Sequence, residues 1–409
     1  MRILLMHPNF PAQFVHIAAA LGHDSKSQVV YVTQREEGSI PGVNKILYKP
    51  SREVRPETHP WVRNTEKAVL EAQAVYRELA NLKTKGFVPD VIYGHSGWGP
   101  TLYMKDLFPQ AALVCYFEWF YRSHGSDCDF DPSEPVTPDL EASIRIKNGP
   151  ILLDLYSCDH GVSPTNYQQS QFPEEYRKKI SVLHDGVNTD FHKPNLGAKL
   201  VLPELQLDLS HVDELVTYVA RGMEPYRGFP QFIEAMAILL KRRPNCHVVI
   251  VGAERVAYGR DLPDGKSYKQ LMLEKVDIDM SRVHFTGLLS RVDYIKVLQA
   301  SSVHVYLTRP FVLSWSMLEA MSSGCAVVAS GTAPVKEVIE DGVNGLLVDF
   351  FSPTQIAATV EEALTNKERV DKIRVRARET ILERYDLRKL LPRQIDLLQQ
   401  VVNAKHHKS

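Results

Sequence analysis

The feature that most constrains this 409-residue chain is a repeated alternation of short β-branched runs with amphipathic stretches, separated by glycine- or proline-marked loops. Residues 64–82 have a helical period, because Ala68, Ala72, Val75 and Leu79 recur at three- and four-residue steps. Such alternation predicts βαβ units, a parallel sheet and right-handed crossovers. In the first half, strands are expected at 2–6, 28–33, 89–93, 112–117, 158–163 and 180–184.

The alternation breaks at residues 194–213, a proline-containing stretch without a helical or strand period, and then restarts. The second set of strands is expected at 215–220, 246–251, 283–285, 303–307, 326–329 and 345–348. We therefore predict an α/β fold of two doubly wound domains followed by C-terminal helices. The expected parts are a first domain at 1–195, a linker at 196–212, a second domain at 213–385 and a terminal helix at 386–409, which should pack back on the first domain. Ligands of such sheets bind beyond the carboxyl ends of the strands, so the expected site is a deep cleft between the domains.

Charge and cysteine content exclude several classes of function. Lys and Arg number 48 against 49 Asp and Glu, a net charge of -1, which disfavours binding to nucleic acid or to an anionic membrane. The five cysteines are widely spaced, which argues against a disulfide framework or a cysteine zinc site and suits a reducing cytosol. No apolar run is long enough to span a membrane, and the apolar run after Arg2 is too short for a signal peptide. We expect a cytoplasmic protein that at most touches a membrane surface.

The segment at 309–333, RPFVLSWSMLEAMSSGCAVVASGTA, predicts a strand end, a tight loop, a helix starting near Ser316 and a further strand. The unpaired N–H groups and partial positive charge at the start of a helix suit a diphosphate. Glu319 would then lie within reach of a pair of sugar hydroxyls. The spacing of Ser316 and Glu319 also fits a capping box, in which the glutamate bonds only to its own helix.

A second segment, VARGMEPYRG at 219–228, places Arg221 and Arg227 each directly before a glycine. Glycine allows close approach of the backbone, and the guanidinium group matches phosphate oxygens. These residues therefore predict a phosphate site, unless both are ordinary surface arginines of a loop.

Six segments occur in one order: 158–194, VARGMEPYRG, VVIVGAE at 248–254, VHFTGLLSRVDYIKVLQAS at 283–301, the LEAMSSGCAVVAS run and EVIEDGVNGLLVD at 337–349. In this order they resemble the retaining glycosyltransferases of family 4, which have the two-Rossmann GT-B fold. The resemblance extends from about Ser157 to Leu364 and is fainter before that range.

The resemblance implies a site for a nucleotide sugar as substrate. UDP is expected over GDP only because it is more common in the family, and a hexose such as glucose is the expected sugar. By position, Arg221 and Arg227 would hold the β-phosphate. The diphosphate would be bound by the N–H groups of Ser314, Trp315 and Ser316. Glu319 would bind the ribose, and the segment 285–288, with Leu288, would contact the base. One departure concerns the sugar itself. Family members carry a second glutamate eight positions earlier, where this chain has Phe311, so the sugar's identity is not specified.

The first domain should hold the acceptor. His95, within GHSGWG, is expected to bond to a sugar or acceptor, although a solvated loop histidine fits the sequence as well. Members of the family often have a histidine that contacts the donor sugar, and at that position this chain has Glu118. We expect Glu118 or the nearby His124 to make this contact. The alternative is that Glu118 is only a salt-bridged loop residue. The loop HPNFPAQF at 7–14 lacks the family's glycines.

Two acidic or histidine-containing stretches are not expected to bind metal. DCDFD at 127–131 lacks the glycine and late glutamate of a calcium loop and suggests a polar lid. His406 and His407 suggest a solvated tail. We expect neither a metal nor a cofactor.

The leading hypothesis is sugar transfer with retention by a front-side route, in which the leaving phosphate takes the acceptor's proton. The two arginines and the helix N–H groups stabilise the leaving phosphate, so no metal is obligatory. The expected catalytic residues are Arg221, Arg227, His95 and Glu118. Sugar phosphate, lipid-linked oligosaccharide, polysaccharide and small metabolite all fit as acceptors. A sugar-nucleotide 2-epimerase of the same fold and a non-catalytic sugar-binding protein are the alternatives; a phosphorylase fits less well, because no residue marks a pyridoxal-phosphate lysine.

Overall fold

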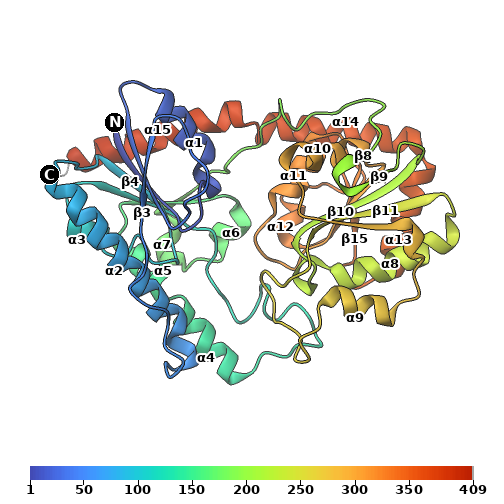
Figure 1. Ribbon diagram of the computed structural model, residues 1–409, viewed down its shortest axis with the longest axis horizontal. Coiled ribbons are helices and arrows are strands. Elements are labelled where there is room, and N and C mark those ends of the chain that lie inside the picture. Colours follow the sequence, from blue (N-terminus) through green and yellow to red (C-terminus); the bar gives the residue numbers. More distant parts are fainter. Residues whose placement is uncertain (408–409) are drawn as a thin grey trace. The chain divides into compact units, whose positions relative to one another are not determined.

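The computed structural model describes residues 1–407 and divides them into two units, each with its own sheet. Unit 1 consists of Met1–Gly186 and the chain from Arg388 onward, and unit 2 consists of Val187–Leu387. Figure 1 labels the helices and strands of both units.

The sheet of unit 1 has seven strands in the order β3-β2-β1-β4-β5-β6-β7, and every neighbouring pair is parallel. The strands are β1 (Arg2–Met6), β2 (Gln28–Thr33), β3 (Val43–Leu47), β4 (Val91–His95), β5 (Ala112–Tyr116), β6 (His160–Ser163) and β7 (Ile180–Val182). All six predicted strands are present, with ends shifted by no more than two residues. The additional strand, β3, lies at the sheet edge and is only partly buried, so it has no apolar run of the kind that identifies the others.

Both faces of this sheet are covered, as in parallel sheets generally. Successive side chains of β1 point to opposite faces: Ile3 and Leu5 join one apolar cluster, and Leu4 and Met6 join the other. All four are fully buried, which stabilises the unit by roughly 1.5–3 kcal/mol per side chain. Helix α1 (Val15–His23) packs on the first face, and α2 (Arg63–Thr84), α3 (Met104–Leu107) and α5 (Gly149–Ser157) pack on the second.

The helix predicted at 64–82 is α2, and it has one buried face and one exposed face. Ala68, Ala72, Val75 and Leu79 are buried on one side, while residues such as Lys67 on the other side are exposed. Within residues 1–407, no helix combines the length and apolar character needed to cross a membrane.

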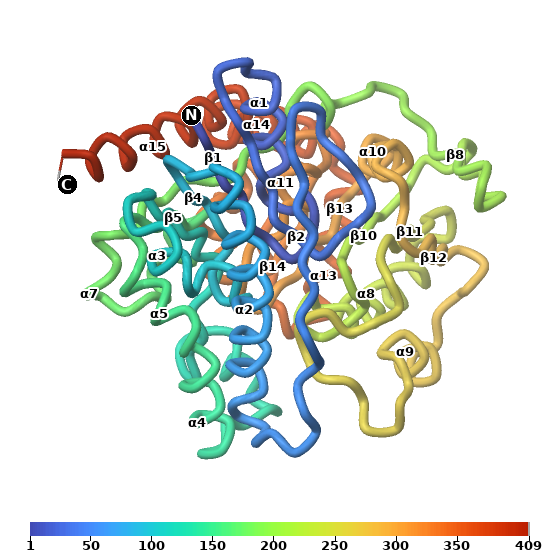
Figure 2. The backbone as a smooth tube through the Cα atoms, turned by 60° about the vertical axis from the view of Figure 1, so that its left-hand side comes forward, coloured from blue at the N-terminus to red at the C-terminus, as the bar shows by residue number. Residues whose placement is uncertain are grey.

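The C-terminal helix α15 (Leu387–His406) completes the core of unit 1. Its Leu390, Leu398 and Val402 belong to the apolar cluster that contains Ile3 and Leu5 of β1. Figure 2 shows α15, in red, beside α1 and the N-terminal strand, although all of unit 2 lies between them in the sequence.

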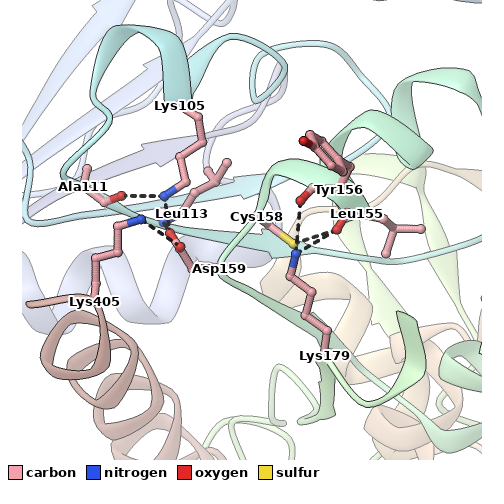
Figure 3. A network of polar contacts seen from close by, with 9 residues as sticks. All are labelled: Lys105, Ala111, Leu113, Leu155, Tyr156, Cys158, Asp159, Lys179 and Lys405. Carbon is pink, nitrogen blue, oxygen red and sulfur yellow. Dashed lines mark hydrogen bonds and ion pairs between the residues drawn. The ribbon is translucent and has the colours of Figure 1, made fainter. Parts of the chain in front are cut away.

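Polar contacts also hold α15 in place. Lys405 Nζ donates to Asp159 Oδ1 at 3.1 Å, and Lys105 binds the other carboxylate oxygen of Asp159, which also accepts from the Leu113 N–H (Figure 3). Nearer the start of α15, Gln394 Nε2 donates to the His184 carbonyl at 3.0 Å. The helix is therefore tied to the sheet at both ends.

The sheet of unit 2 has six parallel strands in the order β12-β11-β10-β13-β14-β15. They are β10 (Glu214–Gly222), β11 (Cys246–Ala253), β12 (Val283–Gly287), β13 (Val303–Tyr306), β14 (Val327–Ser330) and β15 (Leu346–Val348), all six at predicted places. Helices α8 (Phe229–Arg242) and α13 (Pro353–Thr365) cover one face, and α10 (Arg291–Ala300), α11 (Trp315–Ser322) and α14 (Lys367–Arg384) cover the other (Figure 1).

The stretch predicted as a linker, 196–212, belongs instead to unit 2. It contains a small antiparallel pair, β8 (Val201–Leu202) and β9 (Leu207–Asp208). Leu200, Leu202 and Leu209 are buried in a cluster with residues of β10 and β11. The apolar side chains of this irregular stretch therefore pack on the sheet, and the boundary between the units falls earlier, after Gly186.

Candidate active site

Three of the predicted nucleotide-binding segments lie at one edge of the unit 2 sheet. Arg221 is the last residue but one of β10, Leu288 follows β12, and Ser314 follows the loop after β13. Because these strands are parallel, their carboxyl ends meet at the same edge. Arg221 and Leu288 are both exposed there, and Leu288 is 72% accessible.

Arg227 is buried, with 4% of its surface exposed, and the groups it touches are neutral. Its Nη1 donates to Thr308 Oγ1 at 2.7 Å and to the Tyr306 hydroxyl at 3.2 Å. The Tyr306 hydroxyl also accepts the Ser314 N–H at 2.9 Å, so it joins the arginine segment to the start of α11. Within residues 1–407, no carboxylate oxygen lies within 4.0 Å of this guanidinium group. The result is a fixed, buried positive charge without an anion beside it.

Glu224, which the sequence did not suggest, builds the wall beside Arg227. Its fully buried carboxylate accepts three consecutive N–H groups, of residues 257–259, at 2.7–3.1 Å. This loop carries Tyr258, whose ring centroid lies 5.1 Å from Cζ of Arg227. The glutamate thus fixes an aromatic face against the guanidinium group.

The glycines after the two arginines allow close packing within the protein. A Cβ on Gly222 would meet the Arg255 carbonyl at 2.5 Å. Gly228 has φ +62°, and a Cβ there would meet Leu307 Cβ at 2.5 Å. Glycine is therefore needed at both positions for packing within the protein, and this packing sets the position of the arginine before it. This reason differs from the close approach of a ligand that the sequence suggests.

Helix α11 begins at Trp315, one residue earlier than predicted, and Ser314 is its N-cap. Ser314 Oγ accepts from the Ser316 N–H at 3.4 Å and lies 3.0 Å from Ser316 Oγ. Trp315 is 41% exposed, whereas Ser316 is buried. The start of α11 is therefore joined to Arg227 through the Tyr306 hydroxyl, which accepts from both the Ser314 N–H and Arg227 Nη1.

The alternative interpretation of Glu319 as a capping-box residue is wrong. Glu319 Oε2 accepts from the Tyr294 hydroxyl at 2.7 Å, and its Oε1 lies 3.3 Å from His192 Nε2. The Glu319 side chain keeps 22% of its surface exposed. Burial raises the pKa of Glu319 and lowers that of His192 to about 4, so His192 is neutral at pH 7. Glu319 is thus oriented by two side chains from outside its own helix, neither of which was identified from the sequence.

Phe311, at the position where the family has a glutamate, lies in an aromatic cluster. It is buried, with ring centroids 5.4 Å from Tyr226 and 5.3 Å from Tyr258. The guanidinium group of Arg309 lies 5.0 Å from the Tyr226 ring. An ionised carboxylate at position 311 would lose these aromatic contacts.

At the carboxyl edge of the unit 1 sheet, the structure brings together two of the predicted residues and adds two that were not predicted. His95 ends β4 and is 4% exposed, so the alternative of a solvated histidine is wrong. Its Nε2 lies 3.6 Å from Glu118 Oε2, and its ring is 5.0 Å from that of His7, which follows β1. Gln13 donates to Glu118 Oε1 at 3.0 Å. The common position at the ends of adjacent strands is the signal that could have identified His7.

The loop after β4 is held from below by Asp154 of α5. Asp154 Oδ2 accepts from Ser96 Oγ at 2.7 Å and from Thr101 Oγ1 at 2.8 Å, and burial raises the pKa of Asp154 to about 6. Gly99 has φ +110°, and a Cβ there would meet the Ala68 carbonyl at 2.1 Å. These contacts fix the backbone of the loop that carries Trp98.

His124 and Asp129 form contacts at the surface, whereas Asp127 is buried and accepts from Ser126 Oγ at 3.0 Å. His124 is exposed between Glu141 and Asp129, and its hydrogen bond to Glu141 raises its pKa. Asp129 accepts the Gly125 and Ser126 N–H groups at 2.9 and 3.2 Å. His406, the last residue of α15, and His407 are both exposed. In the part of the chain that the structure describes, no group of three or more His, Cys, Asp and Glu side chains could hold a metal ion.

Two family models cover most of the chain. The model of the glycosyl transferase family 4 group matches residues 25–192, and that of the glycosyl transferases group 1 matches residues 206–380. The D-inositol 3-phosphate glycosyltransferase of Streptomyces avermitilis is 25% identical over 218 residues, 50% of this chain and 44% of that protein. The alpha-D-kanosaminyltransferase of Streptomyces kanamyceticus is 29% identical over 154 residues, 38% of this chain and 37% of that protein. The chain thus spans less than half the length of these curated relatives.

Solved structures resemble the chain over nearly its full length. Anabaena HepE in complex with UDP-glucose has a TM-score of 0.68 at 16% identity, over 98% of this chain and 100% of that one. Sucrose-phosphate synthase from Thermosynechococcus elongatus has a TM-score of 0.72 at 15% identity, over 99% and 100%. The motif order, the two parallel sheets and these matches lead to one conclusion: the chain belongs to the family 4 glycosyltransferases and has the GT-B fold.

Proposed function

We propose that this protein transfers a hexosyl group from a UDP-sugar to a hydroxyl acceptor, with retention of configuration at the anomeric carbon. The observation that carries the proposal is Arg227, a buried guanidinium group that faces two hydroxyls and an aromatic ring but no carboxylate within residues 1–407. A buried charge is costly unless an opposite charge meets it. A diphosphate would supply that charge. The resemblance in fold to HepE, whose structure contains UDP-glucose, supports UDP as the nucleotide.

In the proposed donor complex, Arg221 and Arg227 bind the β-phosphate, and the first N–H groups of α11, at 314–316, bind the diphosphate. Glu319, held by Tyr294, accepts from the ribose hydroxyls through its remaining lone pairs. Leu288, exposed at the same sheet edge, packs on the base.

The rate enhancement in this proposal comes from charge stabilisation. As the bond between the anomeric carbon and the phosphate oxygen breaks, negative charge develops on the leaving UDP. Tyr306 and Thr308 already hold Arg227 in place, so its charge is available without reorganisation. The acceptor oxygen bonds to the anomeric carbon on the same face, and its proton passes to the leaving phosphate oxygen. Because arginines neutralise the charge, we propose that the reaction needs no metal ion.

On the acceptor side, we assign the polar contacts to His95 and Glu118 of unit 1. Glu118 lies 3.6 Å from His95, so we assign it to the acceptor, although the family's histidine at this position contacts the donor sugar. His124 is not included, because it is exposed and pairs with Glu141 and Asp129.

The test is release of UDP from a panel of UDP-hexoses in the presence of hydroxyl acceptors. We expect donor-dependent UDP release that requires acceptor and persists in EDTA, and a product whose anomeric configuration, measured by NMR, matches that of the donor. An epimerised nucleotide sugar formed without acceptor would instead identify a 2-epimerase. Binding of a sugar without any turnover would leave only a carbohydrate-binding role.

A further inference from the structure

Five residues at the carboxyl edge of the unit 1 sheet form a cluster that we call the His95 site: His7, Gln13, His95, Trp98 and Glu118. They come from the residue after β1, from the 3-10 helix η1 (Ala12–Phe14), from the end of β4 and the loop after it, and from the residue that follows Phe117 beyond β5. The cluster combines two buried imidazoles, a carboxylate and an exposed indole within one small region.

Hydrogen bonding fixes the role of the His95 ring. Its Nδ1 lies 2.8 Å from the Ser96 carbonyl, and a carbonyl only accepts, so Nδ1 carries a proton. In the neutral ring, Nε2 is therefore an acceptor. This atom is buried and has no hydrogen-bond partner among residues 1–407. Glu118 Oε2, 3.6 Å away, is also an acceptor when ionised. Two neighbouring acceptors of this kind match two O–H donors on a ligand.

Trp98 adds an apolar surface next to these acceptors. Its side chain is 45% exposed, and its ring lies 6.3 Å from the His95 ring and 6.4 Å from the His7 ring. The loop that carries it is fixed by the bonds of Ser96 and Thr101 to Asp154. A flat aromatic face beside a few placed polar groups suits a sugar ring, which has C–H groups on its faces and hydroxyls at its rim.

The carboxylate of Glu118 disfavours a phosphorylated ligand. At about 4 Å, even in bulk water, one like charge raises Kd roughly fivefold, and the effect grows as water is excluded. Resting on the proposed function, we propose that the His95 site binds the acceptor as an uncharged sugar or polyol. Two of its hydroxyls donate to His95 Nε2 and to Glu118, and Trp98 packs on its C–H face.

The first experiment measures binding to the full chain saturated with UDP, by calorimetry. The ligands are methyl glucoside, methyl mannoside, methyl galactoside and myo-inositol, each compared with a phosphate ester of the same sugar or polyol. We expect at least one uncharged ligand to bind about fivefold or more tightly than its phosphate ester. Tighter binding of the esters, or no binding of any uncharged ligand, would overturn the proposal.

Three variants test the residues, and a fourth is the control. His95→Asn keeps a donor toward Ser96 but removes the Nε2 acceptor, and should weaken binding of the uncharged ligand about two- to tenfold. Trp98→Ala should weaken it about tenfold. Trp61→Ala, in the same unit, should have no effect. Glu118→Gln should reduce the preference over phosphate esters about fivefold. Wild-type affinities and preference in all three site variants would overturn the assignment.

Failure of this proposal can be separated from failure of the proposed function. His95→Asn and Trp98→Ala should leave the Kd values of UDP and UDP-glucose unchanged, because the groups that we assign to the donor are in unit 2. If Trp98→Ala weakens UDP-glucose but not UDP, the ring bound at the site is the donor's sugar, and the acceptor assignment is wrong. If wild type binds an uncharged sugar but neither UDP nor UDP-glucose, the donor half of the proposed function fails while the sugar site stands.

Discussion

Arg227→Met tests whether the buried guanidinium group serves a ligand or the fold. Methionine has a similar length and no charge, so the substitution removes the cation from beside Tyr306 and Thr308 while largely filling its volume. Both hydroxyls keep other partners: Tyr306 accepts from the Ser314 N–H, and Thr308 donates to the Arg309 carbonyl. The variant therefore leaves few polar atoms unsatisfied.

The two expected effects have opposite signs. A charge-assisted hydrogen bond is worth about 1.5–3 kcal/mol, so UDP should bind roughly 10- to 150-fold more weakly. The free protein should not lose stability. Desolvation of the cation costs several kcal/mol, and replacement of buried charges by apolar groups is often neutral or stabilising by about 1–4 kcal/mol. In a unit of this size that corresponds to a Tm that is unchanged or higher, by about 2–4 °C per kcal/mol.

The assay is calorimetric titration with UDP, paired with thermal unfolding in the absence of nucleotide. Arg243→Met is a matched control in the same unit, because Arg243 pairs with Glu214 through its Nε and Nη2 donors and is about as exposed as that partner. The control should lower Tm by a few degrees, since it leaves Glu214 without its cation, and should not change the Kd of UDP.

The reasoning is refuted if Arg227→Met binds UDP as wild type does, or if it lowers Tm by as much as the Arg243 variant. Either result would make Arg227 a structural residue.

Three further changes test other parts of the structure. Glu319→Gln should weaken UDP roughly five- to tenfold, because hydrogen bonds to a charged acceptor become neutral ones, and should weaken 2′-deoxy-UDP less; equal losses would exclude contact with the ribose. Burial raises the pKa of Asp154 from 3.8 to about 6, so protonation of Asp154 favours the folded state. The free energy of unfolding should therefore fall by up to about 3 kcal/mol as pH rises from 4 to 7. Urea titrations of Asp154→Asn should lack this dependence on pH. Asp159→Asn should increase hydrogen exchange in α15, because the ion pair between Lys405 and Asp159 is lost, whereas unchanged exchange would mean that this ion pair does not hold the helix.

The elements that position the site could be predicted because each follows from a local pattern. Twelve strands are visible as β-branched runs, and all of them occur in the structure. The edge strand β3 and the pair in 196–212 were missed, since partly buried or two-residue strands have no run long enough to detect. The linker interpretation failed for a related reason: proline suggested a loop, whereas the leucines nearby decided the packing.

The candidate site was predictable only where residues lie close in sequence. Arg227 and Ser314 could be named, but the Tyr306 hydroxyl that joins them could not, since it depends on which strands are neighbours. The capping-box alternative for Glu319 relied on sequence spacing, and the structure replaces it with Tyr294 and His192, far away along the chain. Similarly, His95 and Glu118 were named one by one, and their pairing required the strand order.

The return of α15 to unit 1 has a consequence for biosynthesis. Unit 2 is a single continuous stretch of chain, whereas the core of unit 1 includes Leu390, Leu398 and Val402. A ribosome therefore releases every residue of unit 2 before unit 1 can bury its last apolar face. The half of the molecule that starts to fold first is completed last, and until then the apolar surface beside β1 that α15 covers stays exposed to solvent.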